Sequence, residues 1–257
     1  MDINPTQHLL KAGMVKAGGT LWILTTLLLL VTSAIPASSQ TKFQEDILAT
    51  SGGDLRITFI GHGSLMFAFG GKAIYVDPVS SYADYSRLPK ADLILITHEH
   101  GDHLDPKAIQ ALRTDGTVLV ANPSSAKRLT NAEIMTNGQT GTYAGLRVEA
   151  VPAYNLEKSY HPKGNGNGYI ISFGDKRVYV AGDTENTPEM KSLKQIDVAF
   201  LPMNLPYTMT PEMVADAARA FRPKILYPYH FGDTDTGKLT DLLKNEKGIE
   251  VRIRNMK

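Results

Sequence analysis

His98-Glu99-His100-Gly101-Asp102-His103 is the stretch of this sequence that says most about its fold and its chemistry. It places three of the chain's seven histidines and one aspartate within six positions, directly after the apolar run Ala91–Thr97. Imidazole nitrogens and carboxylate oxygens are the ligands that zinc and other first-row divalent metals prefer. A loop with this spacing can direct His98 and His100 at one ion and Asp102 and His103 at a second. The stretch therefore predicts a metal site on a loop that leaves a buried strand.

The rest of the chain reads as short strands separated by Gly, Pro and Asp, with helices toward the end of each half. Strands are predicted at 55–60, 65–69, 72–76, 91–97, 117–121, 146–151, 168–173, 177–181, 198–201, 225–229 and 250–253. Helices are predicted at 105–113, 124–129, 210–221 and 236–245, two of them with an Asp or Thr cap followed by proline. This order predicts an α/β fold in which two sheets form the core and helices pack outside.

Residues 1–40 have the pattern of an export signal. Lys11 and Lys16 precede an uncharged stretch whose centre, Leu21–Ile35, is strongly apolar, and small residues follow it. This pattern is typical of a secretory signal peptide, but the apolar stretch is also near the length that crosses a bilayer. We therefore expect either a cleaved signal peptide or a retained N-terminal membrane anchor. In both cases residues 41–257 form one domain outside the cytoplasmic membrane, secreted or periplasmic.

Charge and cysteine content limit the binding partners and the metal ligands that this chain can have. The chain has 27 basic and 26 acidic side chains, of which two lysines and one aspartate lie in residues 1–40. The remaining charge is balanced, so we expect no nucleic-acid binding, and membrane contact only through residues 1–40. The chain has no cysteine, which excludes disulfides and thiolate metal ligands. Nothing in the pattern indicates an oligomeric state.

Other candidate ligands stand at strand ends or in loops. His62, His161 and His230 are the histidines outside both residues 1–40 and the opening stretch. Asp183 follows a predicted strand in Val180-Ala181-Gly182-Asp183-Thr184, and Asp77 ends another in Tyr75-Val76-Asp77-Pro78. Polar side chains at the ends of buried strands give a site a rigid base, so we expect these residues to meet the opening stretch.

These motifs together resemble those of the metallo-β-lactamase superfamily. Thr97–His103 resembles its signature, and Asp77-Pro78, Gly182-Asp183-Thr184 and Tyr229-His230-Phe231 match its other metal-site motifs in order. The resemblance extends from residue 55 to nearly the C-terminus. It is strongest to small zinc-dependent hydrolases related to L-ascorbate-6-phosphate lactonase and N-acyl-phosphatidylethanolamine phospholipase D. It implies an αββα four-layer sandwich with a dinuclear metal site at one edge of the two sheets.

The resemblance also implies a ligand set. His98 and His100 would hold the first metal. Asp102, His103 and His230 would hold the second, and Asp183 would bind both. The third histidine of the first metal, which often follows a Pro-Ala pair in relatives, is missing from Val151-Pro152-Ala153-Tyr154-Asn155. We expect His161 to replace it, with Asn155 or water as the alternative, because an amide oxygen is a weaker zinc ligand than imidazole.

Several further residues have expected roles. His62 is equally consistent with a catalytic residue that holds substrate or developing charge and with a structural histidine. Asp77 is expected to accept a hydrogen bond from a ligating histidine and fix its tautomer, the alternative being a simple strand-ending turn. Glu99 is expected to point away from the metals. Residues 202–210 are expected to line the pocket through Asn204, Tyr207 and Met209.

The sequence thus predicts a metal-dependent hydrolase. We expect two Zn²⁺ ions, with Mn²⁺ as the alternative, to hold a hydroxide, because metal binding lowers the pKa of water from about 15.7 to near 7. This hydroxide would attack the carbonyl or phosphorus of a small-molecule or lipid-like ester, lactone or phosphodiester, with Asp102 orienting it. Two alternatives are a non-catalytic metal- or ligand-binding protein and a diiron redox protein, in which an acidic residue usually replaces His100.

Overall fold

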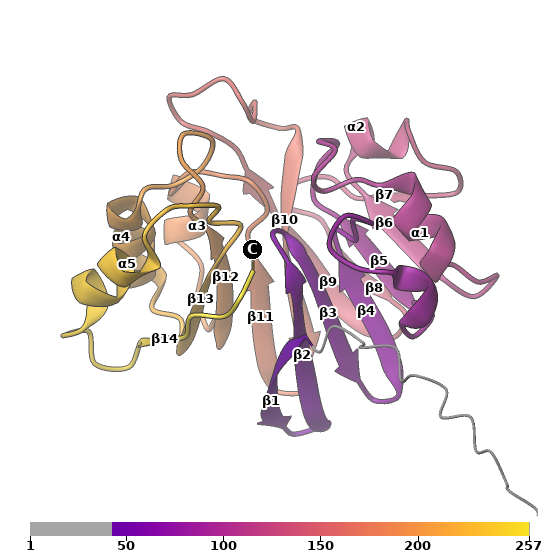
Figure 1. Ribbon diagram of the computed structural model, residues 1–257, viewed down its shortest axis with the longest axis horizontal. Coiled ribbons are helices and arrows are strands. Elements are labelled where there is room, and N and C mark those ends of the chain that lie inside the picture. Colours follow the sequence, from indigo (N-terminus) through magenta and orange to yellow (C-terminus); the bar gives the residue numbers. More distant parts are fainter. Residues whose placement is uncertain (1–42, 257) are drawn as a thin grey trace, which may run out of the picture. The chain divides into compact units, whose positions relative to one another are not determined.

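Two seven-stranded sheets form the framework of residues 43–256, the part of the chain that this computed structural model describes (Figure 1). The first sheet contains, in this order, β1 (Gln44–Thr50), β2 (Gly53–Gly61), β3 (Ser64–Phe69), β4 (Lys72–Val76), β5 (Leu93–Ile96), β6 (Val118–Ala121) and β7 (Glu133–Ile134). The second contains β8 (Thr140–Tyr143), β9 (Leu146–Ala153), β10 (Gly166–Phe173), β11 (Lys176–Val180), β12 (Val198–Pro202), β13 (Ile225–Tyr229) and β14 (Glu250–Val251).

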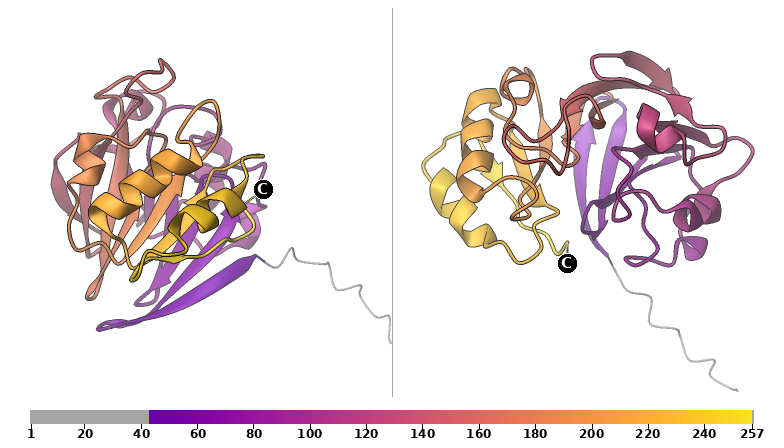
Figure 2. Two further views of the ribbon diagram at one scale, coloured as in Figure 1. Left: turned by 90° about the vertical axis from the view of Figure 1, so that its left-hand side faces the viewer. Right: turned by 90° about the horizontal axis from the view of Figure 1, so that it is seen from above.

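Helices cover the outer face of each sheet, as the view from above in Figure 2 shows. The first half of the chain contributes the 3-10 helix η1 (Tyr85–Arg87), α1 (Pro106–Leu112) and α2 (Pro123–Ala126), and the second contributes α3 (Pro188–Lys191), α4 (Pro211–Phe221) and α5 (Thr236–Leu243). Ile109 of α1 shares an apolar cluster with Ile94 of β5, and Phe221 of α4 packs edge-on against Tyr179 of β11. The predicted αββα sandwich is confirmed.

The core between the sheets is aromatic at its centre. Phe200 of β12 is completely buried, and its ring stacks on Tyr227 of β13 with centroids 5.0 Å apart. Across the interface its ring lies 6.2 Å from Phe59 of β2 and 5.9 Å from Phe67 of β3. Aromatic pairs of this kind contribute beyond the apolar area that they bury. Phe200 therefore helps to fix how the two sheets face each other.

Parallel pairing gathers the predicted ligands at one edge. β4, β5 and β6 are parallel in the first sheet, and β11, β12 and β13 are parallel in the second. The carboxyl ends of parallel strands meet at the same edge of a sheet. Asp77 and His98 therefore leave the first sheet together, after β4 and β5, while Asp183 and His230 leave the second, after β11 and β13.

Two hydrogen bonds join the sheets at this edge. The Tyr169 hydroxyl of β10 donates to the carbonyl of Ile96 at 2.8 Å, and the backbone N–H of Asn167 donates to the carbonyl of Thr97 at 2.9 Å. The acceptors lie at the end of β5, immediately before His98. These bonds hold the start of the histidine-rich loop against the second sheet.

All eleven predicted strands correspond to observed ones, but β1, β7 and β8 were not predicted, nor was α3. The strand β1 lies at the edge of its sheet with alternately exposed and half-buried side chains, and its only apolar run is the three residues Ile47–Ala49 after three polar ones. The predicted signal peptide or anchor, residues 1–40, lies outside the described residues. Within residues 43–256, no helix combines the length and apolar composition needed to cross a membrane.

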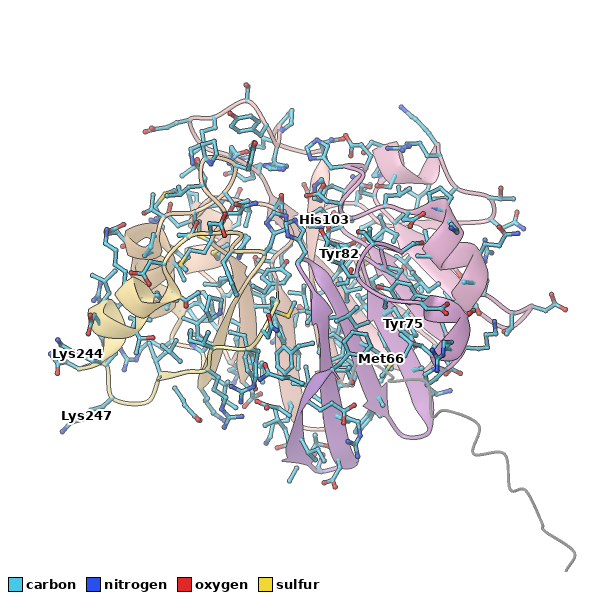
Figure 3. The ribbon with its side chains drawn as sticks, viewed as in Figure 1. Met66, Tyr75, Tyr82, His103, Lys244 and Lys247 are labelled. Atoms are coloured by element: carbon cyan, nitrogen blue, oxygen red, sulfur yellow. The ribbon has the colours of Figure 1, made fainter. Side chains whose placement is uncertain are left out.

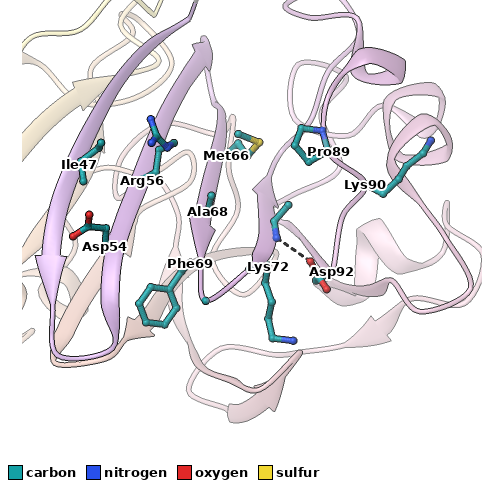
Figure 4. Close-up of a pocket in the computed structure, with 13 residues that line it drawn as sticks. Ile47, Asp54, Arg56, Met66, Ala68, Phe69, Lys72, Pro89, Lys90 and Asp92 are labelled. Atoms are coloured by element: carbon teal, nitrogen blue, oxygen red, sulfur yellow. Dashed lines mark hydrogen bonds between the residues drawn. The ribbon is translucent and has the colours of Figure 1, made fainter.

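A groove of about 410 Å³ opens on the outer face of the first sheet (Figure 4). It lies around the Gly70-Gly71 turn, at the end of β3 and β4 opposite to Asp77. In Figure 4 the Asp92 carboxylate accepts a hydrogen bond from the backbone N–H of Ala73, at 2.8 Å. The groove is therefore separate from the edge where the histidines gather.

Phe200→Ala should lower the free energy of unfolding by about 3–5 kcal/mol, because it leaves a cavity between the sheets. Urea denaturation measures this change. The control is Ile134→Ala, whose side chain is 59% exposed and whose effect should stay within about 0.5 kcal/mol. A loss below about 1 kcal/mol for Phe200→Ala would contradict the role given to this ring.

Candidate metal centre

All eight site residues predicted from the sequence meet at the edge where the parallel strands end. They are His62, His98, His100, Asp102, His103, His161, Asp183 and His230, and their side-chain nitrogen and oxygen atoms form three overlapping groups, each within 4.8 Å. Figure 3 shows His103 at this upper end of the strands, where the two halves of the molecule meet. The structure thus brings together residues that are up to 168 positions apart, from His62 to His230.

The first group consists of three histidines. His98, His100 and His161 each offer one ring nitrogen within 4.8 Å of the others. The Nε2 atom of His161 lies 3.2 Å from Oδ2 of Asp183, and that of His98 lies 4.0 Å from the same oxygen. His98 and His161 are buried, whereas His100 is exposed. The group therefore has two inner imidazoles and one at the surface.

The second group consists of His62, Asp102, His103 and His230, and two of its histidines face the other oxygen of Asp183. Oδ1 of Asp183 lies 3.3 Å from Nε2 of His103 and 3.5 Å from Nε2 of His230. Oδ2 of Asp102 lies 3.8 Å and 3.3 Å from the same two nitrogens. Asp183 therefore stands between the two groups and turns one oxygen toward each.

Asp77 orients two of these histidines from behind. Its Oδ1 accepts a hydrogen bond from the Thr97 backbone N–H at 2.8 Å, and its Oδ2 accepts from the Thr97 hydroxyl at 2.6 Å and from Nδ1 of His103 at 2.7 Å. Because the Thr97 hydroxyl hydrogen goes to Asp77, its oxygen accepts from Nδ1 of His98, at 2.9 Å. Both imidazoles therefore donate from Nδ1, and Nε2 is the nitrogen that each turns toward the centre.

Left-handed backbone turns the chain sharply at three strand ends. His62, Asp77 and His230 have φ angles of 53°, 46° and 45°, a region that residues with a Cβ rarely adopt. Such positions cost of order 1–3 kcal/mol each and persist where the surrounding structure holds them. Here the backbone N–H of His230 donates to the carbonyl of His62 at 3.0 Å, which ties two of these turns together.

Asn155 supports His161 and does not face the centre itself. Its Oδ1 accepts hydrogen bonds from Nδ1 of His161 at 2.7 Å and from its backbone N–H at 2.9 Å. Its Nδ2 donates to the carbonyl of Tyr207 at 3.0 Å. Of the two candidates for completing the first group, His161 is therefore the one whose ring nitrogen lies beside Asp183. The supporting role of Asn155 has no signal in the sequence.

His62 lies behind Asp102. Its Nε2 atom is 3.1 Å from Oδ2 of Asp102, and its ring packs between Tyr82, with centroids 5.4 Å apart, and His230, at 3.7 Å. Burial alone would raise the pKa of Asp102, but hydrogen bonds from His230 and His62 outweigh it and hold this pKa far below its usual range. Asp102 is therefore ionised, and its side chain is 44% exposed.

The electrostatics of the centre favour a cation. Burial alone would raise the pKa of Asp183, but the charges of His230 and His103 hold it well below its usual range. Burial, followed by the charge of His103, lowers the pKa of His98 well below its usual value, which leaves this imidazole neutral. Burial alone would lower the pKa of His103, but the carboxylates of Asp183 and Asp77 outweigh it and raise this pKa well above its usual value. The buried carboxylates thus attract positive charge.

Unpartnered atoms show that a divalent metal fits these residues. Nε2 of His98, Nε2 of His103 and Oδ1 of Asp183 are buried without a hydrogen-bond partner. A buried polar atom in this state costs about 1–3 kcal/mol. All three point into the two groups, and imidazole nitrogens with carboxylate oxygens suit zinc or manganese. A bound cation would satisfy them.

A cavity of about 230 Å³ opens over both groups. It is lined by His100, Asp102, Tyr160, His161, Asp183, Asn204, Tyr207 and His230. Asn204 and Tyr207 line it as expected. The prediction for Met209 was wrong, because this side chain is completely buried in the apolar core. Tyr160, which directly precedes His161, lines the cavity as well.

Glu99 points away from the centre, as expected. Its carboxylate accepts hydrogen bonds from the Ser124 hydroxyl at 2.7 Å and from Nδ2 of Asn165 at 2.5 Å. Asn165 belongs to the loop of residues 154–165, between β9 and β10, that also carries His161. Glu99 therefore holds that loop beside the histidine-rich one.

A family model and similar proteins of known sequence point to the same protein family. A family model described as a beta-lactamase superfamily domain matches residues 56–230. A UPF0173 metal-dependent hydrolase of Nitratidesulfovibrio vulgaris is 33% identical over 225 residues, which cover 78% of this chain and 92% of the relative. One from Methanopyrus kandleri is 30% identical over 194 residues, covering 69% of this chain and 84% of the relative.

Two solved structures similar to this one are also of metal-dependent hydrolases. A candidate metal-dependent hydrolase of Parabacteroides distasonis matches with a TM-score of 0.82 and 56% identity, covering 84% of this chain and all of that one. Igni18, a metallo hydrolase of Ignicoccus hospitalis, matches with a TM-score of 0.67 and 25% identity, covering 79% and 95%. The chain therefore belongs to the beta-lactamase superfamily, has the metallo-β-lactamase fold, and is a metal-dependent hydrolase.

Proposed function

We propose that this chain is a dinuclear hydrolase that uses two Zn²⁺ ions, or Mn²⁺, on an ester, lactone or phosphodiester. The position of Asp183 is the observation that supports this most strongly. Its Oδ2 lies 3.2 Å from Nε2 of His161 and its Oδ1 lies 3.3 Å from Nε2 of His103. A buried carboxylate with one oxygen toward each of two imidazole groups is suited to hold two cations close together.

The ligands divide between two ions. His98, His100 and His161 would hold the first ion, Asp102, His103 and His230 would hold the second, and Asp183 would contact both. Two such ions would supply a water nucleophile at neutral pH, because metal binding lowers the pKa of water from about 15.7 to near 7. Histidine at position 100, where related diiron redox proteins usually have an acidic residue, favours hydrolysis.

The chain's own residues orient the reaction. Asp102 is ionised and half exposed in the cavity, so its carboxylate can accept a hydrogen bond from the nucleophile and orient it toward the substrate. His62 does not line the cavity, and its hydrogen bond to Oδ2 of Asp102 makes it a positioning residue for that carboxylate. Asn204 lines the cavity with a side-chain amide, which can donate a hydrogen bond to a substrate oxygen.

Asp183→Ala should remove both metals and the activity, because each group loses its shared carboxylate. We expect metal content to fall from two ions per chain to fewer than one, and phosphodiester or lactone hydrolysis to fall at least about a hundredfold. Elemental analysis after dialysis, with a chromogenic assay, measures both. Asp115→Ala, at an exposed loop aspartate, is the matched control. Two ions per chain and full turnover in Asp183→Ala would refute the proposal.

Asn155→Ala should selectively weaken the first metal group. The substitution removes the acceptor for Nδ1 of His161, and loss of such a supporting bond typically lowers metal affinity 10–100-fold. We expect one tightly held ion per chain where the parent holds two, measured by competition with a chromogenic chelator. Asn155→Asp keeps an oxygen acceptor and should keep the second ion. Equal metal affinity in Asn155→Ala and the parent would show that His161 needs no such support.

A further inference from the structure

Two loop segments form one wall of the cavity above the metal groups. Residues 155–161 carry Tyr160, and residues 203–210 carry Tyr207. Three contacts join the segments: Nδ2 of Asn155 donates to the carbonyl of Tyr207 at 3.0 Å, Nζ of Lys158 donates to the carbonyl of Thr208 at 2.8 Å, and the two tyrosine rings meet edge-on. The ring centroids are 5.0 Å apart at an angle of 73°.

This wall exposes an unusual share of apolar surface. Of the seven large hydrophobic side chains that are exposed in the described part of the chain, four lie on these two segments, at Leu156, Tyr160, Leu205 and Tyr207. The tyrosines are 43% and 45% exposed. Exposed apolar side chains that gather beside polar groups mark binding sites. Both tyrosines line the same 230 Å³ cavity as the histidines and aspartates of the centre, so their part of the apolar surface belongs to the site.

A buried carboxylate holds the wall in place. Glu185 is only 3% exposed, and its Oε2 accepts hydrogen bonds from the backbone N–H of Leu156 at 2.7 Å and of Glu157 at 3.3 Å. Its Oε1 lies 3.0 Å from Nζ of Lys158, the same ammonium group that reaches the second segment. The segment that carries Tyr160 is thus fixed at its start. A wall that is already ordered loses little conformational entropy when a ligand binds.

We propose that Tyr160 and Tyr207 form a subsite for an aromatic ring of the substrate, so that the substrate is an aryl-bearing ester or phosphodiester. An edge-to-face pair of rings offers a third ring both stacked and edge-on contacts. The cavity is below the usual size of ligand pockets, about 300–1,000 Å³, which suits one ring beside the scissile group better than a long acyl chain. This inference rests on the proposed function, because the scissile group must reach the metals while the ring contacts the wall.

Binding of two phosphonates to the zinc-loaded protein tests the subsite without turnover. Phenylphosphonate and methylphosphonate carry the same metal-binding anion, but only the first has a ring. We expect phenylphosphonate to bind about tenfold tighter by calorimetry, the size of effect that an aromatic contact gives. In Tyr160→Ala/Tyr207→Ala this ratio should fall to about one. Tyr160→Phe/Tyr207→Phe should keep it, and so should the control Ile47→Ala, an exposed residue in the groove at the opposite end of the sheet.

The outcomes separate the subsite from the centre. Equal binding of the two phosphonates by the parent would overturn the subsite and leave the metal centre standing. A loss of selectivity in the Phe variant would overturn it too, since recognition would then belong to the hydroxyl groups. If Tyr160→Ala/Tyr207→Ala loses affinity for both phosphonates by the same factor, the tyrosines support the centre and do not bind the ring, which would also overturn the subsite. If neither phosphonate binds the parent, the proposed centre fails and the subsite fails with it.

Discussion

The hydrogen bonds of one buried carboxylate, Asp77, determine the geometry of the metal centre. Asp77 has no exposed surface, and its two oxygens accept from the Thr97 backbone, the Thr97 hydroxyl and Nδ1 of His103. Through Thr97 it also fixes the tautomer of His98. One residue therefore orients one imidazole in each of the two groups of candidate metal ligands. Without it, buried donors would lose their acceptor, which is more costly than the net value of the bonds themselves.

Asn155 has a comparable position on the other side of the centre. Its oxygen orients His161, while its nitrogen holds the backbone of Tyr207. The first group of candidate ligands, His98, His100 and His161, is therefore connected to the proposed aromatic wall through a single amide. A displacement of Tyr207 would therefore move Asn155 and with it His161, and a displacement of His161 would move Tyr207 in the same way. The left-handed turns at His62 and His230 add backbone strain at the same site. The surrounding sheets hold these strained residues in place.

The sequence predicted those parts of the site that depend on residue type at strand ends. The histidine-rich loop, Asp183 and His230 each follow a strand of the parallel part of a sheet, so their convergence follows from topology. The approach of His161 was harder to predict, because it depends on contacts of a long loop with Asn155 and Glu99 that no periodicity encodes. The edge strand β1 was missed because its apolar run is only three residues long and none of its side chains is fully buried. Met209 was misplaced because a loop position does not reveal which way a side chain turns.

Anomalous diffraction at the zinc edge, from crystals grown with zinc, distinguishes a two-metal centre from a single site. Two peaks are expected on opposite sides of the Asp183 carboxylate, each about 2.0–2.2 Å from a different oxygen. One peak should lie among His98, His100 and His161, and the other among Asp102, His103 and His230. A single peak, or zinc bound elsewhere with Asp183 free of metal, would contradict the two-metal centre.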